Sequence, residues 1–164
     1  MAQAEKTLND LFLEVLKDMY SAEKQILRAL PKMSKVSESE ELARAFEKHR
    51  EETEGQIERI EQVFEMMDKP ARAKTCEAMK GIVQEANEVA QEFKSSEALD
   101  ACLIAAAQTV EHYEITRYGT LKSWATQLGL DDAAKLLDRS LEEEKKTDKL
   151  LTQFAEQQAN AKAA

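Results

Sequence analysis

With 164 residues, the chain fits one domain that would bury about 70% of the surface that its unfolded form exposes. Its 43% hydrophobic and 34% charged residues exclude a disordered chain, and no apolar run approaches the roughly 20 residues that cross a bilayer. The net charge of −9 argues against a nucleic-acid partner, because phosphates would repel it. The first residues, MAQAEKTLND, lack an apolar signal core, so we expect a cytoplasmic protein.

Helical periodicity predicts four long helices and one shorter helix in a single domain, 1–164, and no segment alternates as a strand does. The expected helices cover residues 5–34, 38–67, 74–93, 96–128 and 132–158. Ser37 and Glu40 form a capping-box pattern, which predicts the start of the second helix. Gly129 suits the turn that ends the fourth helix.

The connections after the first and the fourth helix are short, so each of these helices should form an antiparallel hairpin with the next one. The segment between the hairpins carries the shorter helix and is long enough to travel the length of the bundle. We therefore predict an all-α, ferritin-like antiparallel four-helix bundle with one long crossover that carries a short extra helix. Cys76 and Cys102 are expected to be reduced, because they show neither metal-binding spacing nor a secretory context.

Every long helix interrupts its apolar row near its middle with polar side chains. These are Glu23 in the first helix, His49, Glu52 and Gln56 in the second, Glu111 and Glu114 in the fourth, and Glu144 and Asp148 in the last. Because the midpoints of antiparallel neighbours lie side by side, we expect these groups to converge at one level of the bundle.

Several ionised carboxylates cannot share a buried layer unaided, since desolvation and mutual repulsion would protonate most of them. Two divalent ions would neutralise four carboxylates, and oxygen-and-imidazole sites suit Fe or Mn. The pattern therefore predicts a di-metal site in the bundle core. Two other interpretations stay open: single glutamates can reach solvent at the edge of an apolar row, and a polar core can be hydrogen-bonded without metal.

Two tyrosines and a second histidine lie near these carboxylates in the sequence. Tyr20 comes one turn before Glu23, and Tyr118 comes one turn after Glu114. Either hydroxyl could hydrogen-bond a ligand carboxylate, or the ring could simply fill the core with its hydroxyl satisfied. His112 falls off the carboxylate row, so we expect it at the surface or at an interface.

Five stretches carry a resemblance to a known family. They are YSAEKQ (20–25), KHREETEGQ (48–56), KTCEAMKGIVQEA (74–86), VEHYEITRYGT (110–120) and LEEEKKTDKL (141–150). With them the chain resembles, over nearly its whole length, the YciE/YciF-type bacterial stress proteins, a rubrerythrin-related branch of the ferritin-like superfamily. The resemblance implies a cytoplasmic, homodimeric four-helix bundle that is produced under stress and holds a di-metal centre.

The resemblance also implies roles for single residues. Glu23, Glu52 and Glu144 would each supply a metal ligand from their own helix. Glu111-x-x-Glu114 resembles the paired glutamates of rubrerythrins.

The sequence also departs from the pattern of di-iron bundles. Its second helix reads His49-x-x-Glu52 where such bundles usually carry Glu-x-x-His, with Gln56 downstream. Asp148 stands where such centres often place histidine, and the last helix has no histidine. Fewer imidazoles weaken the case for standard ferroxidase or peroxidase chemistry and leave a different metal, or none, as alternatives.

The resulting prediction is a ferritin-like di-metal-carboxylate protein of the bacterial stress response, with Fe or Mn, that could act on O₂ or peroxide. The alternative is a metal-free dimeric stress scaffold with a hydrogen-bonded polar core, and a storage cage also fits the length. Expected partners are a second copy of the chain and a small oxidant, with no nucleic acid and no membrane. The sequence leaves open whether the protein is an enzyme.

Overall fold

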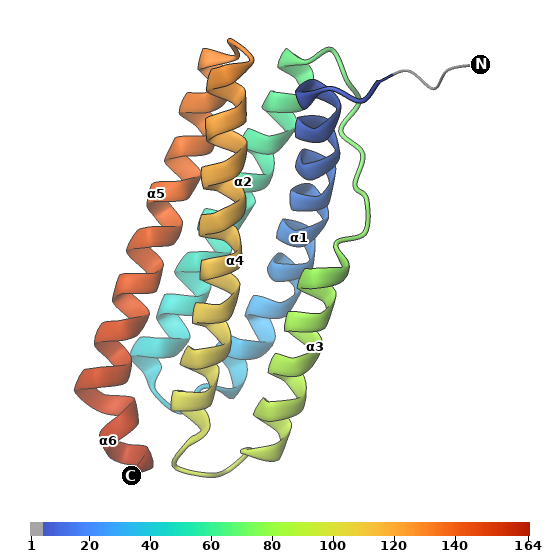
Figure 1. Ribbon diagram of the computed structural model, residues 1–164. Helices are drawn as coiled ribbons and strands as arrows, with labels where there is room; N and C mark the ends of the chain where they lie inside the picture. Colours follow the sequence, from blue (N-terminus) through green and yellow to red (C-terminus); the bar gives the residue numbers. More distant parts are fainter. Residues whose placement is uncertain (1–4) are drawn as a thin grey trace.

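Four long helices pack lengthwise into a bundle in the computed structural model, which describes residues 5–164 (Figure 1). The long helices are α1 (Leu8–Val36), α2 (Glu40–Met66), α4 (Leu99–Gln127) and α5 (Asp131–Phe154). The shorter α3 (Glu77–Glu92) lies beside α1 and α4, and α5 continues through a π-helical turn, Ala155–Ala159, into α6 (Asn160–Ala163). The described residues contain no strand, so the predicted all-α four-helix bundle with a helical crossover is confirmed.

The crossover between the two hairpins is tied to α1 by hydrogen bonds. The backbone N–H of Lys74 donates to the carbonyl of Lys17 at 3.1 Å. Further along, the N–H of Cys76 donates to the Ser21 hydroxyl at 3.0 Å, and the Gln25 amide donates to the Cys76 carbonyl at 3.1 Å. The crossover therefore runs alongside α1 and delivers α3 to the lower half of the bundle in Figure 1.

The turn between α1 and α2 differs from its sequence prediction. The N-cap of α2 is Ser39, not Ser37, and the helix begins at Glu40. The buried Asp100 carboxylate, from α4, accepts hydrogen bonds from the backbone N–H groups of Glu38 and Ser39, both at 2.8 Å. The position of this turn is thus set by a residue far away in sequence, which a local capping pattern does not reveal.

Three other features of the fold concern its cysteines, the turn after α4 and the apolar character of its helices. Cys76 and Cys102 are free thiols, as predicted. Gly129 ends α4 with φ 72°, a left-handed conformation that glycine adopts without steric penalty. None of the helices within residues 5–164 is long and apolar enough to cross a membrane.

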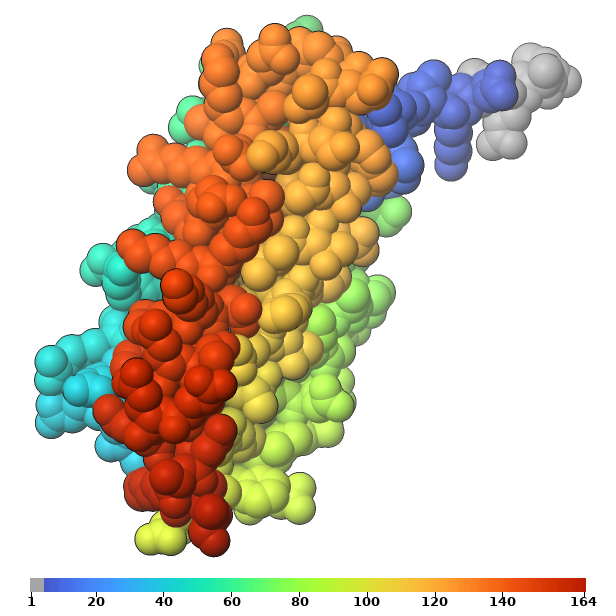
Figure 2. Space-filling view, turned by 60° about the vertical axis from the view of Figure 1, so that its left-hand side comes forward, coloured from blue at the N-terminus to red at the C-terminus, as the bar shows by residue number. Residues whose placement is uncertain are grey.

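The bundle core is apolar at both ends and polar between them. Phe12 and Phe64 are fully buried toward one end, and Leu30 and Leu42 are buried toward the other. On the face seen in Figure 2, side chains of α4 and α5 meet along the length of the bundle. Polar side chains halfway along the helices are therefore held away from solvent.

Candidate metal centre

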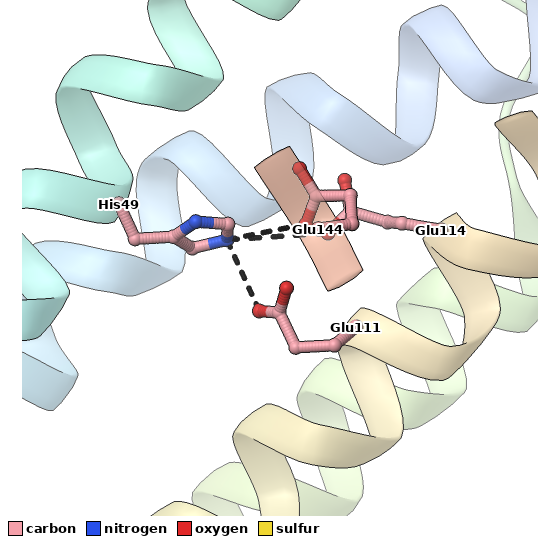
Figure 3. A group of neighbouring side chains, drawn as sticks. All are labelled: His49, Glu111, Glu114 and Glu144. Atoms are coloured by element: carbon pink, nitrogen blue, oxygen red, sulfur yellow. Dashed lines mark ion pairs between the residues drawn. The ribbon is translucent and has the colours of Figure 1, made fainter. Parts of the chain in front are cut away.

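Four buried side chains from three helices point toward one another in the middle of the bundle (Figure 3). His49 comes from α2, Glu111 and Glu114 come from α4, and Glu144 comes from α5. Each offers one ligand atom, and these atoms all lie within 4.8 Å of one another. Ligand atoms about 2 Å from a common ion are separated by up to about 4 Å. The group could therefore hold one ion once its most distant atoms move slightly closer together.

The helical repeat explains why α4 turns two carboxylates inward. Glu111 and Glu114 stand one turn apart and therefore share a face of the helix. The same face carries Ala107 on the N-terminal side of the two glutamates and Leu121 on their C-terminal side, both buried. The row that packs into the core thus carries both carboxylates, as the sequence pattern predicts.

The four side chains point at a common volume, but no hydrogen bond links His49 to the carboxylates. Its Nε2 atom lies 3.2 Å from Glu111, 3.9 Å from Glu144 and 4.0 Å from Glu114. Within residues 5–164, nine buried side-chain nitrogen or oxygen atoms lack a hydrogen-bond partner. Eight of them belong to the central group and its two neighbours, and these six residues are Glu23, His49, Gln56, Glu111, Glu114 and Glu144. Buried polar atoms rarely stay unpaired, and this concentration of them lies on residues that could hold a cation.

Burial and crowding change the acidity of the central group. Burial raises the pKa of Glu111 and of Glu114 well above the usual range, and the charge of Glu144 raises both further. Burial alone would lower the pKa of His49, but the neighbouring Glu52 and the charge of Glu144 outweigh it, so that pKa is raised. The cluster therefore favours bound positive charge, supplied by protons or by a metal ion.

Glu23 brings α1 into the same layer. One of its carboxylate oxygens accepts a hydrogen bond from the Tyr118 hydroxyl, and the other has no partner. Burial raises the pKa of Glu23 to about 8, with a further contribution from the charge of Glu144. All four long helices thus contribute a buried carboxylate or imidazole to one layer. Tyr20, by contrast, donates its hydroxyl to the exposed Glu61 at 2.6 Å.

Gln56 joins the central group to a second polar network that sequence reasoning missed. Its amide nitrogen donates to Glu144, and it lies 3.3 Å from Glu143. The Arg59 guanidinium donates two hydrogen bonds to the Glu143 carboxylate, at 2.8 and 2.7 Å, in a bidentate contact. It also donates to the Ser140 hydroxyl at 2.8 Å. The available signal was spacing, since Arg59 follows Gln56 by three residues and so shares its helix face.

The remaining two predicted ligands lie at the edge of the centre or outside it. Glu52 is partly exposed, 3.7 Å from Nδ1 of His49 and 3.6 Å from the Lys48 ammonium. Asp148 pairs with the exposed His112 at 3.2 Å and accepts from the Gln108 amide at 3.1 Å. The structure therefore does not bring Asp148 into the central group, and it confirms the surface position of His112.

The donor set decides which ions fit. One imidazole and three carboxylates make a hard to borderline site, which suits Fe²⁺, Mn²⁺ or a similar ion better than soft ions that prefer thiolates. The unpaired atoms face the interior of the group, where a cation would neutralise charge and supply the missing partner. The residues present therefore fit a metal ion.

The fold and the site together define a four-helix bundle with a helical crossover that carries a buried imidazole-carboxylate cluster between its long helices. More particularly, the chain belongs to the family described as a domain of unknown function, DUF892, which matches residues 7–164. It is 54% identical over 160 residues to Protein YciF of Escherichia coli (strain K12), and the match covers 96% of each chain.

Solved structures agree with this family membership. The crystal structure of the E. coli stress protein YciF matches with a TM-score of 0.90 and 52% identity, covering 95% of this chain and 99% of that one. YcfI from Rhodopseudomonas palustris matches with a TM-score of 0.88 and 43% identity, covering 93% and 97%. A Xanthomonas campestris protein shares the fold at 20% identity, with a TM-score of 0.75 and coverage of 95% and 96%.

Proposed function

We propose that this chain is a metal-carboxylate protein of the bacterial stress response that binds Fe or Mn at the middle of its bundle. The single observation that carries the proposal is the set of buried, unpartnered ligand atoms on His49, Glu111, Glu114 and Glu144. The stress role rests on similarity to the E. coli stress protein YciF.

We propose two ions in each chain. The first would be held by the four residues of the central group. The second would lie toward Glu23, whose free oxygen is buried in the same layer and whose pKa responds to the charge of Glu144. The residues that would hold the two ions are thus His49, Glu111, Glu114, Glu144 and Glu23, with Glu52 beside His49 at the solvent edge.

Bound Fe or Mn would supply redox chemistry toward a small oxidant such as O₂ or peroxide. The protein's own residues have defined parts in such a centre. The Tyr118 hydroxyl holds one oxygen of Glu23, and the Gln56 amide holds one oxygen of Glu144, so each of these carboxylates keeps its other oxygen free. Apolar neighbours such as Leu121 and Ile60 exclude bulk water from the layer.

A metal-free scaffold is the second candidate, and the same two hydrogen bonds favour it. Tyr118 and Gln56 satisfy one oxygen each of Glu23 and Glu144 without any ion. Protonation would relieve the remaining charge, because burial raises the pKa of Glu23, Glu111 and Glu114. On this reading the layer would be a neutral hydrogen-bonded core.

Metal counting separates the two candidates. After anaerobic loading with Fe(II) or Mn(II) and removal of free ions, we expect about two ions per chain by mass spectrometry of the metals. Glu144→Gln should lose most of the bound metal, whereas Glu142→Gln, which changes an exposed carboxylate on the same helix, should keep it. A wild-type protein that retains no more metal than Glu144→Gln would overturn the proposal and leave the scaffold.

We further propose that the protein is a cytoplasmic homodimer. The proposal follows the family resemblance and competes with a large storage cage of the same subunit. Light scattering coupled to size exclusion tests it directly, since a dimer of an 18.5 kDa chain and a cage differ greatly in mass.

A further inference from the structure

A cavity of about 680 Å³ lies in the lower half of the bundle, beside the metal centre. It is bounded by residues 26–36 of α1, 45–52 of α2, 83–91 of α3 with Lys94 just beyond it, 99–111 of α4 and 146–151 of α5. The volume falls in the range of about 300–1,000 Å³ that is typical of small-molecule sites. At 1.5 Å per residue, the lining segment of α1 extends about 15 Å along the bundle. The cavity is therefore elongated.

The walls of this cavity are apolar, and small residues leave its space open. Ile26, Leu30, Phe46 and Leu103 form part of the buried wall, each at most 4% exposed. Alanines line it from four helices: Ala29 on α1, Ala45 on α2, Ala86 and Ala90 on α3, and Ala106 and Ala107 on α4. Each alanine stands where a larger side chain would fill the volume. The chemistry of the walls favours an aliphatic chain.

The two carboxylates that line the cavity, Glu52 and Glu111, lie at the end next to His49, where Lys48 also lines it and pairs with the partly exposed Glu52 at 3.6 Å. Lys146 of α5 lines the cavity as well. Three exposed lysines line the other end of the cavity: Lys32 and Lys35 near the C-terminal end of α1, and Lys94 just after α3. No carboxylate lines the cavity there, and none of the three lysines forms an ion pair within the described residues. In a chain of net charge −9, this end of the cavity offers only positive charge.

We propose that the cavity binds a straight-chain aliphatic carboxylate, with its head group at Lys32, Lys35 and Lys94 and its chain directed into the bundle. The lysine ammonium groups complement the carboxylate, while the buried Glu111 disfavours it at the end next to His49. The apolar walls receive the chain, and the elongated shape favours an unbranched one. The site does not require metal in the neighbouring centre.

The direct test is calorimetric titration of the metal-free full-length protein with octanoate, decanoate and dodecanoate, each below its micelle concentration. We expect saturable binding that tightens about fourfold with each added methylene group. Dodecylammonium, with the same chain and the opposite charge, should bind at least tenfold more weakly than dodecanoate. Equal affinity for the two probes, or no saturable binding of dodecanoate, would overturn the proposal.

Matched variants locate the site within the fold. Ala106→Phe and Ala90→Phe place a ring in the cavity from two different helices and should each weaken dodecanoate binding at least tenfold. Ala105→Phe is the control, because Ala105 is exposed on the same helix and does not line the cavity. Helical signal and melting temperature establish that each variant folds. Dodecanoate binding that survives both cavity variants unchanged contradicts the assignment.

The head-group end is tested by charge removal. The double substitution of Lys32→Gln and Lys94→Gln should weaken dodecanoate binding severalfold. The substitution of Lys69→Gln with Lys149→Gln, two exposed lysines outside the cavity lining, should not weaken it. Glu144→Gln should bind dodecanoate like the wild type even if it has lost metal. Failure of the metal centre and failure of this site are thus distinguishable.

Discussion

Tyr118 of α4 donates its hydroxyl to the Glu23 carboxylate of α1, and both side chains are fully buried. The bond joins the two helical hairpins through the polar layer rather than through apolar contact. Removing a partner from a buried polar group leaves the other unsatisfied, at a typical cost of about 1–3 kcal/mol. The pair is therefore a point at which the polar layer contributes to the stability of the whole bundle.

Tyr118→Phe should destabilise the metal-free protein by about 1–3 kcal/mol, since Glu23 loses the hydrogen bond that the Tyr118 hydroxyl donates to it. Urea unfolding followed by circular dichroism measures the change. Tyr20→Phe is the matched control, because Tyr20 donates to the exposed Glu61 and water can replace that bond. The control should cost less than Tyr118→Phe. Equal losses would show that the Tyr118–Glu23 bond adds nothing beyond a surface hydrogen bond.

The raised pKa of Glu23 predicts how stability depends on pH. Burial raises this pKa from 4.5 to about 8, with a contribution from Glu144. Between these values the unfolded chain releases the proton while the folded chain keeps it, so stability falls as pH rises toward 8. The effect should be on the order of a few kcal/mol for the metal-free protein. Urea unfolding at pH 5, 6, 7 and 8 measures it.

Glu23→Gln isolates this contribution, because the amide cannot ionise. The other groups that face Glu23, namely Tyr118, Glu114, Glu144 and His49, remain and keep their own titrations. We expect a shallower decline between pH 5 and 8 in Glu23→Gln than in the wild type. Identical pH profiles would refute the assignment of the decline to Glu23.

The fold was largely predictable from the sequence, because each long helix carries an apolar row at helical spacing on either side of its polar middle, and short connections force antiparallel hairpins. The start of α2 was not predictable in this way. The Asp100 carboxylate of α4 fixes it by accepting hydrogen bonds from the backbone N–H groups of Glu38 and Ser39, which precede α2. A capping pattern around Ser37 carries no information about that distant carboxylate. Helix boundaries that depend on tertiary contacts cannot be predicted from the local sequence pattern.

The sequence predicted the site residues that lie on the core-facing rows of the helices. It was less accurate for residues at the edge of the site. Glu111 and Glu114 were found because they interrupt a buried row. Asp148 fits a helical spacing just as well, yet its carboxylate contacts Gln108 and His112 of α4 instead of the central group. Spacing fixes a helix face to within about one residue, and that margin separates a ligand from a surface ion pair.

The contact between Arg59 and Glu143 should make a measurable contribution to stability. The pair is bidentate at 2.7 and 2.8 Å, with the Arg59 side chain only 10% exposed. Arg59→Met removes the cation and leaves Glu143 without its partner, which typically costs about 3–5 kcal/mol for a buried pair and less at partial exposure. Lys122→Met breaks a more exposed pair with Asp138 and should cost less than about 1 kcal/mol. Thermal or urea unfolding compares them, and equal losses contradict the prediction.

Two substitutions separate the central ligands from the surface pair beside them. His49→Gln should weaken metal binding at least tenfold, because His49 offers the one imidazole among the four groups whose ligand atoms lie within 4.8 Å of one another. Asp148→Asn should leave the metal content unchanged, since Asp148 contacts His112 and Gln108 instead. Competition with a chromogenic chelator measures both affinities. Loss of one bound ion in Asp148→Asn would mean that metal draws Asp148 inward from the surface pair, and the second ion would then belong beside Glu111.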